Sequence, residues 1–297
     1  MTSLTLFTPA GVLLSPAPLR QAARRLKAWG FDVRVDADAL ARRQRFAGDD
    51  DTRLAAIHRI ADERPSIALA TRGGYGLTRL LDRLDWKRLA ASVAAGTRWV
   101  GHSDLTALQM GLLAHAKAPS WCGPMACDDF GREVLDDVTP DCFREAMSGD
   151  LEAVGFRTEA GFDGLDVRGV SWGGNLAMLC SLVGTPHLPK VKGGVLILED
   201  VAEHPYRVER MLLQLHQAGV LGMQKAVVLG AFTDFRRSPM DRGYTLKSAI
   251  AHLRGVADVP ILTGFPFGHV PTKVTVPFGV KLHLVVQARD VLMGWQG

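Results

Sequence analysis

Residues 66–76 read SIALATRGGYG and residues 98–105 read RWVGHSDL, and these two stretches indicate the fold class. Each begins with a short apolar run that predicts a buried strand, over 66–70 and 98–102, and each leads through a polar turn into a helical pattern. Strands that pass directly into helices are typical of a parallel sheet covered on both faces. Ligands bind such sheets at the carboxyl ends of the strands, so both turns are candidate site segments.

The same alternation continues on either side of these stretches. In the N-terminal half, strands are predicted at Leu4–Phe7, Phe31–Val35, Ser66–Ala70 and Arg98–His102, and helices at Pro18–Trp29, Asp51–Ala61, Leu77–Leu84 and Leu105–Ala114. In the C-terminal half, apolar runs at Gly193–Leu198 and Ala226–Gly230 alternate with helices at Tyr206–Ala218 and Leu246–Leu253, and β-branched strands follow at Val274–Phe278 and Lys281–Val286.

We therefore predict an α/β fold with an N-terminal parallel-sheet α/β domain over residues 1–135 and a C-terminal α/β domain with additional strands over 166–297. Residues 136–165 combine acidic residues, glycine and weak periodicity, and we expect a linker there with one helix around Asp141–Met147.

Length and composition agree with a globular chain of two domains. The 297 residues are 47% hydrophobic and 22% charged, with a mean hydropathy of +0.07, which excludes a disordered protein. No run approaches the roughly 20 apolar residues of a membrane helix, and the first residues lack the positive region of a signal peptide. Four cysteines form no CxxC pair, which favours a reduced, cytoplasmic setting.

The net charge of +4 is modest. Arg24, Arg25 and Lys27 cluster on one predicted helix, but acidic residues are interleaved and no aromatic stacking motif accompanies them. A solvated helix face is the simpler interpretation, and we expect no nucleic-acid partner. A weak positive field would still attract a small anionic substrate.

The turn after the 98–102 strand places Ser103 at its tip. A serine on a sharp strand-to-helix turn exposes its hydroxyl, and the backbone N–H of the next residue, Asp104, points at the same space. Ser and Asp are also preferred helix N-caps, so a structural role for Ser103 remains open. Leu105 replaces the second glycine of the GxSxG pattern.

The glycines at 73, 74 and 76 allow a tight turn and close approach of the backbone to a ligand, and helix N-terminal amides offer donors to an anion. The stretch matches neither the Walker A pattern nor GxGxxG. An ordinary glycine-rich turn is the alternative.

Two residues of the C-terminal half complete a possible catalytic set. Glu199 ends an apolar strand, and His269 follows Pro266 and Gly268 in a loop. A serine hydroxyl needs a base, and the base needs a carboxylate to orient it, so Ser103, His269 and Glu199 supply the required groups. Asp200 is a rival acid, both acids could equally be solvated, and His269 could be a satisfied loop histidine. No HExxH or clustered Cys/His spacing appears, so we expect no metal and no cofactor.

Five motifs in order resemble the LD-carboxypeptidase family of serine peptidases, which includes murein tetrapeptide carboxypeptidases and microcin C immunity peptidases. The motifs are Arg72–Gly76, Gly101–Leu108, Trp172–Leu176, Leu198–Asp200 with Pro205–Arg207, and Gly268–His269. The resemblance spans about residues 4–285. His102 stands where the family usually carries an aromatic residue, and Leu77 stands where a small residue is common.

The resemblance implies roles for individual residues. Ser103 would be the nucleophile, His269 the base and Glu199 its orienting carboxylate, while the backbone amides of Gly74 and Asp104 would form the oxyanion hole. The residues expected to bind substrate are Arg72, Gly73 and Trp172, although Trp172 could instead be a core aromatic.

The resemblance also implies a substrate. A cytoplasmic murein tetrapeptide would lose its terminal D-alanine by cleavage of an L–D amide during cell-wall recycling, and the enzyme would be a homodimer. The alternatives are an immunity-type peptidase acting on an aminoacyl-nucleotide or acyl-sulfamoyl adenylate, and a non-enzymatic anion-binding module.

Overall fold

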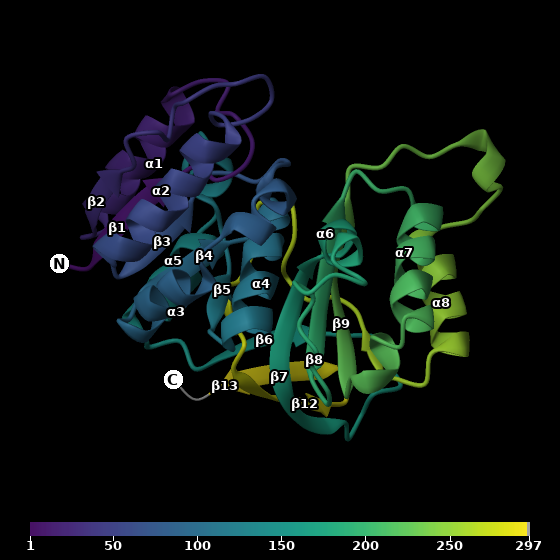
Figure 1. Ribbon diagram of the computed structural model, residues 1–297. Coiled ribbons are helices and arrows are strands. Elements are labelled where there is room, and N and C mark those ends of the chain that lie inside the picture. Colours follow the sequence, from purple (N-terminus) through teal and green to yellow (C-terminus); the bar gives the residue numbers. More distant parts are fainter. Residues whose placement is uncertain (296–297) are drawn as a thin grey trace.

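The computed structural model describes residues 1–295 and contains two sheets flanked by helices (Figure 1). The first sheet has six strands, and only the edge strand nearest the C-terminus runs antiparallel to its neighbour. In spatial order the strands are β2 (Asp32–Val35), β1 (Ser3–Phe7), β3 (Ile67–Ala70), β4 (Arg98–Gly101), β5 (Ser120–Cys122) and β11 (Val276–Phe278).

Helices cover both faces of this sheet. Alternate residues of each strand point to opposite faces, and both faces carry apolar side chains that need to be buried. Leu4 and Leu6 pack in one hydrophobic cluster with α1 and α5, whereas Phe7 and Trp99 pack in another with α2, α3 and α4. The covered parallel sheet is the predicted one. The helices are α1 (Ala17–Ala28), α2 (Asp50–Glu63), α3 (Trp86–Ala94), α4 (Thr106–Ala116) and α5 (Val138–Ser148).

The second sheet has seven strands and is mixed. Its half from β10 to β7 is parallel, whereas β12, β13 and β6 continue it as an antiparallel meander. In spatial order the strands are β10 (Ile261–Leu262), β9 (Ala226–Thr233), β8 (Val195–Val201), β7 (Asp166–Asn175), β12 (Lys281–Gln287), β13 (Asp290–Trp295) and β6 (Ala153–Arg157). Its helices are α6 (Leu176–Ser181), α7 (Pro205–Gln217) and α8 (Leu246–Val256).

Several features differ from the sequence prediction, which also did not include β5, β7, α6 and β10. The helix α3 was not predicted, although Trp86, Leu89 and Val93 recur at helical spacing and pack against the core. The stretch expected as one helix at Leu77–Leu84 forms two separate 3₁₀ turns, Leu77–Arg79 and Leu81–Arg83. The region 136–165 holds the expected helix, α5, and also the edge strand β6, which shows little periodicity because it buries a single side chain. The proposed boundaries at 135 and 166 remain a prediction.

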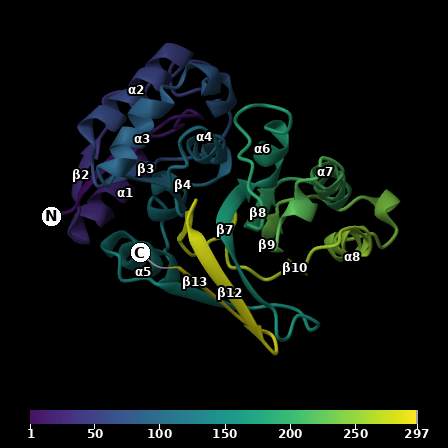
Figure 2. The same cartoon turned by 60° about the horizontal axis from the view of Figure 1, so that its bottom comes forward.

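The two sheets meet where α4 lies against α6 and β7 (Figures 1 and 2). The strand β11 is distant from β5 in sequence yet pairs with it, so the last part of the chain touches both sheets. Within residues 1–295, none of the helices combines the length and apolar composition needed to cross a bilayer.

Candidate active site

Ser103 occupies a strained turn between β4 and α4. Its φ is +60°, a left-handed conformation that non-glycine residues seldom adopt and that functional sites often retain. His102 holds the cap position of the following 3₁₀ turn, and no side chain caps that turn. Ser103 therefore does not act as the helix N-cap that the sequence left open as an alternative. A Cβ added to Gly73 would lie 2.6 Å from the Ser103 Cβ, so the serine side chain faces the glycine backbone.

The glycine-rich loop is tied to the serine turn by the carboxylate of Asp104. Asp104 is fully buried, and its Oδ2 accepts a hydrogen bond of 2.9 Å from the Leu77 backbone N–H. Burial raises the pKa of Asp104 to about 6. Gly74, at φ +108°, donates no backbone hydrogen bond within residues 1–295, and the Asp104 amide lies in a first helical turn, where such donors lack helical partners. Neither amide therefore donates to a backbone acceptor within residues 1–295.

His269 and Glu199 form a hydrogen-bonded pair. The His269 Nδ1–H donates to Glu199 Oε2 at 2.8 Å; Glu199 is fully buried, whereas 21% of the His269 side chain is exposed. Burial alone would lower the pKa of His269, but the hydrogen bond to Glu199 and its charge outweigh that effect, so the pKa is raised. Because Nδ1 is occupied, only Nε2 remains free to exchange a proton at the site.

The strand geometry explains why two adjacent acids face different partners. The pairing of β8 with β9 shifts register between Leu198 and Asp200, and such a bulge re-aims the side chains around it. Asp200 accepts hydrogen bonds from the backbone N–H of Ala177 and Val201, at 2.9 and 2.8 Å. Its burial raises its pKa to about 6. Glu199, and not the rival Asp200, contacts the imidazole.

Asn175 belongs to the Trp172–Leu176 motif, and no role was predicted for it from the sequence. Its Nδ2 donates to Glu199 Oε1 at 3.2 Å and to Asp200 Oδ1 at 2.8 Å, and its backbone N–H donates to Thr106 Oγ1 at 3.0 Å. Thr106 begins α4, so Asn175 links the serine turn to the acid pair. The signal was a polar residue after two glycines at the end of a strand.

His102 brings the serine turn next to the histidine loop. The rings of His102 and His269 meet edge to face with centroids 4.9 Å apart, and the His102 Nδ1–H donates to Gly123 O at 2.9 Å. Burial holds the pKa of His102 well below its usual range, so it is neutral. Within the described chain, no hydrogen bond joins Ser103 to His269. Catalytic hydrogen bonds often tighten only when substrate is bound.

The three residues expected to bind substrate differ in their surroundings. Gly73 faces Ser103, as described above. Arg72 is half-buried: one Nη1–H donates to Val12 O at 2.9 Å, and its buried Nε has no partner within the described chain. The expectation that Trp172 binds substrate is corrected, because Trp172 is 1% exposed and its indole N–H donates to Gln224 Oε1 at 3.0 Å. It is a core aromatic, the alternative left open by the sequence.

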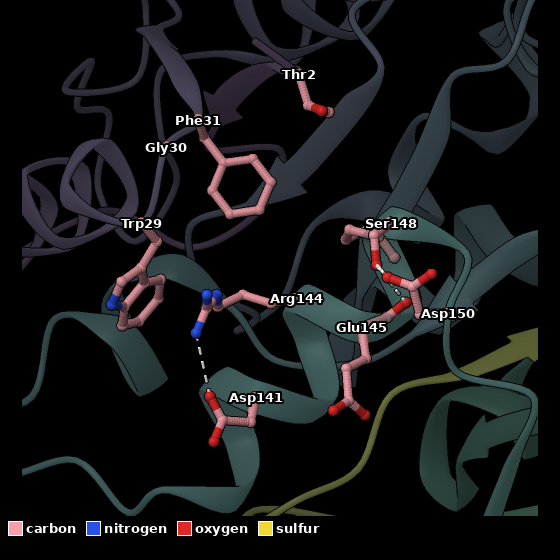
Figure 3. Close-up of a pocket in the computed structure, with 10 residues that line it drawn as sticks. Thr2, Trp29, Gly30, Phe31, Asp141, Arg144, Glu145, Ser148 and Asp150 are labelled. Atoms are coloured by element: carbon pink, nitrogen blue, oxygen red, sulfur yellow. Dashed lines mark hydrogen bonds and ion pairs between the residues drawn. The ribbon is translucent and has the colours of Figure 1, made fainter.

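A cavity of about 380 Å³ lies away from these residues (Figure 3). Thr2 and Phe31 line it just before β1 and β2 begin, and the Asp141–Arg144 ion pair forms part of its wall. It therefore sits at the amino ends of the strands, opposite the edge where a parallel sheet places its active site. Among residues 1–295, no group of three or more His, Cys, Asp or Glu side chains is arranged to hold a metal ion.

Family models and known relatives match this chain over nearly its whole length. Models of the LD-carboxypeptidase N-terminal and C-terminal domains match residues 4–123 and 168–284. The chain is 35% identical to a putative carboxypeptidase of Streptomyces coelicolor, over 87% of this chain and 83% of the relative. It is 30% identical to the murein tetrapeptide carboxypeptidase of Pseudomonas aeruginosa, over 93% of this chain and 91% of the relative.

The chain belongs to the LD-carboxypeptidase family. This LD-carboxypeptidase is an enzyme of the serine-peptidase type. A crystal structure of muramoyltetrapeptide carboxypeptidase from Oxalobacter formigenes matches it with a TM-score of 0.92 at 40% identity, covering 100% of this chain and 99% of that chain. The microcin C7 self immunity protein MccF, in its wild-type apo state, shares the fold with a TM-score of 0.87 at 21% identity, covering 99% of this chain and 96% of that chain.

Proposed function

We propose that this LD-carboxypeptidase releases D-alanine from murein tetrapeptide by hydrolysing the amide between an L-centre and the terminal D-residue. The hydrogen bond of 2.8 Å between His269 and the buried Glu199 carries the proposal, because it prepares an imidazole to act as a base. Relatives named for this activity support the substrate, since they align over most of both chains.

In the proposed acylation step, Ser103 Oγ attacks the scissile carbonyl and His269 Nε2 takes the hydroxyl proton. Glu199 holds the Nδ1 proton in place and stabilises the imidazolium that forms. The oxyanion is bound by the backbone amides of Gly74 and Asp104, and such a preorganised donor is typically worth about 3–4 kcal/mol in the transition state.

In the following steps, His269 Nε2 gives its proton to the departing amine of D-alanine, and the amide C–N bond breaks. Water then attacks the acyl-serine ester, with Nε2 as its base, and the ester C–O bond breaks to regenerate Ser103. No metal or external co-reactant other than water is needed for this balance.

Arg72 is the proposed partner of the substrate's terminal carboxylate. Its Nη2 group donates to no acceptor within residues 1–295 and is not fully buried, so a donor remains for an incoming anion. The adjacent Gly73 packs directly against Ser103, since a Cβ at position 73 would clash with Ser103 Oγ. A carboxylate held here would place the preceding amide against the serine.

The setting and assembly of the enzyme are part of the same proposal. Four free cysteines, all buried, support a reduced cytoplasmic compartment, where the enzyme would act in cell-wall recycling. A homodimer is proposed by family resemblance, and light scattering of the purified protein tests it. The immunity-type alternative gains no support from Trp172, because a buried indole offers no face to a nucleobase.

The proposal is tested by incubating the enzyme with the murein tetrapeptide and with an isomer that ends in L-alanine. Mass analysis should show loss of D-alanine only. Replacing the nucleophile in Ser103→Ala should lower kcat by about 10⁶-fold and abolish labelling by a fluorophosphonate. The exposed Ser181→Ala on α6 is the matched control. Turnover by clean Ser103→Ala protein would refute the role of this serine.

A further inference from the structure

The loop that carries His269 is held at both ends, by different sheets. On its amino side, the Ala231 N–H of β9 donates to Phe267 O at 2.8 Å. On its carboxyl side, the chain joins the first sheet, where Val276 of β11 pairs with Cys122 of β5. The imidazole therefore sits where the chain crosses from one sheet to the other.

A buried ion pair lies on the carboxyl side of this crossing. Lys273 Nζ contacts Asp129 Oδ1, and each side chain is only 1% exposed. Asp129 belongs to a π-helical turn at Ala126–Phe130, and its Oδ2 accepts a hydrogen bond of 2.7 Å from the Met125 N–H. The Lys273 backbone N–H donates to Thr139 Oγ1 at 2.9 Å. Both members are thus fixed from two directions.

Stability alone is a poor explanation for such a pair. Removing two charges from water is costly, and a buried ion pair is often no more stabilising than apolar residues of similar volume. Each charged side chain of such a pair does, however, require its own partner in one geometry. The pair is therefore suited to fixing the register of two segments. Here the two segments are the histidine loop and the part of the chain that follows β5.

We propose that the Lys273–Asp129 pair is a positioning device that registers the His269 loop against the serine turn, so that imidazole and hydroxyl can meet. The inference rests on the proposed roles of Ser103 and His269. Neither member of the pair is accessible to substrate, so both act through His269. The Lys273–Asp129 pair would preserve the edge-to-face contact between the rings of His102 and His269.

The pair also has an electrostatic consequence at the imidazole. Four titratable groups besides Lys273 face His269: Glu199 and Asp200 from β8, His102 from the serine turn, and Asp128 from the π-helical turn. The two β8 carboxylates raise the pKa of His269, whereas the Lys273 charge lowers it. Neutralising the pair also removes the Asp129 charge, but Lys273 and not Asp129 is among the groups that shift the pKa of His269, so that pKa should rise. A purely structural role would not predict this direction.

The test compares Lys273→Met/Asp129→Asn with wild type. The asparagine can still accept from Met125, and no unpaired charge is left buried. We expect the rate of fluorophosphonate labelling at Ser103 and kcat to fall by about 100-fold with little change in KM, because small misplacements of reacting groups cost this much. NMR titration should show a higher pKa for His269. Lys281→Met, an exposed lysine on β12, is the control.

The apolar pair Lys273→Met/Asp129→Leu serves if the first variant does not fold, with unfolding curves to check both. A folded variant that labels and turns over at the wild-type rate would overturn the inference, as would an unchanged pKa of His269. Labelling and NMR do not involve the peptide. A wild-type enzyme that labels at Ser103 but leaves the tetrapeptide intact would therefore refute the proposed substrate alone.

Discussion

Glu199→Gln is the most informative single change at the site. In the wild type, Glu199 Oε1 accepts from Asn175 Nδ2 at 3.2 Å while Oε2 accepts from His269 Nδ1 at 2.8 Å. A glutamine has one oxygen and one NH₂, and the fixed Asn175 donor will select the oxygen. The NH₂ then faces Nδ1, which must become an acceptor. The ring proton moves to Nε2, and His269 can no longer take the proton of Ser103.

The expected loss follows from this wrong tautomer. In a serine triad, the corresponding carboxylate-to-amide change lowers kcat by about 10⁴-fold, which at about 1.4 kcal/mol per factor of ten is a loss of about 5.5 kcal/mol. Glu199→Ala is the comparison. It imposes no donor on Nδ1, so the imidazole can still populate the useful tautomer. Glu199→Gln should therefore be the slower enzyme, although it is the more conservative change.

The assay measures D-alanine release from the tetrapeptide under saturating substrate, with thermal unfolding to confirm that both variants fold. Nitrogen NMR of the imidazole reports which ring nitrogen carries the proton. The reasoning is refuted if Glu199→Gln keeps kcat within about tenfold of wild type, since a wrong tautomer costs far more. It is equally refuted if Glu199→Ala proves clearly slower than Glu199→Gln.

Two further predictions concern the loop and the pH profile. In Gly73→Ala the new Cβ would lie 2.6 Å from Ser103 Cβ, so we expect kcat to fall by about 100-fold or more, whereas Gly155→Ala on β6, with 3.8 Å to its nearest atom, should be unaffected. His269 is a base only when neutral and its pKa is raised from 6.5, so log kcat/KM should fall as the pH drops through a value above 6.5. An acidic limb below pH 6.5 would contradict the assigned effect of Glu199.

Much of the site could be predicted from the sequence because its residues sit at the ends of recognisable strands. Ser103 and Glu199 each follow a buried apolar run, and the carboxyl ends of parallel strands meet at one edge of a sheet. Local pattern could not separate Glu199 from Asp200. The choice depends on a register shift between β8 and β9 and on the hydrogen bond that Asp200 accepts from the Ala177 N–H, and both involve neighbouring elements.

The role of Trp172 could not be decided from the local sequence either. An indole beside two glycines fits a ligand site or a core equally well, and only its burial and the partner of its N–H, Gln224 from 52 residues away in the chain, decide the question. Asn175 had no assigned role for a related reason. Its function as a bridge requires Thr106 and Glu199 to lie on either side of it.

The sequence by itself determined most of the alternation of strands and helices in the first half of the chain, though not α3 or β5, and the family to which the protein belongs, because periodicity and motifs are local properties. Only the tertiary structure decided which acid meets the imidazole, that Trp172 is core, and that β11 returns to the first sheet beside β5. These facts depend on contacts between segments up to about 150 residues apart, whose geometry is set by packing and buried hydrogen bonds rather than by local pattern.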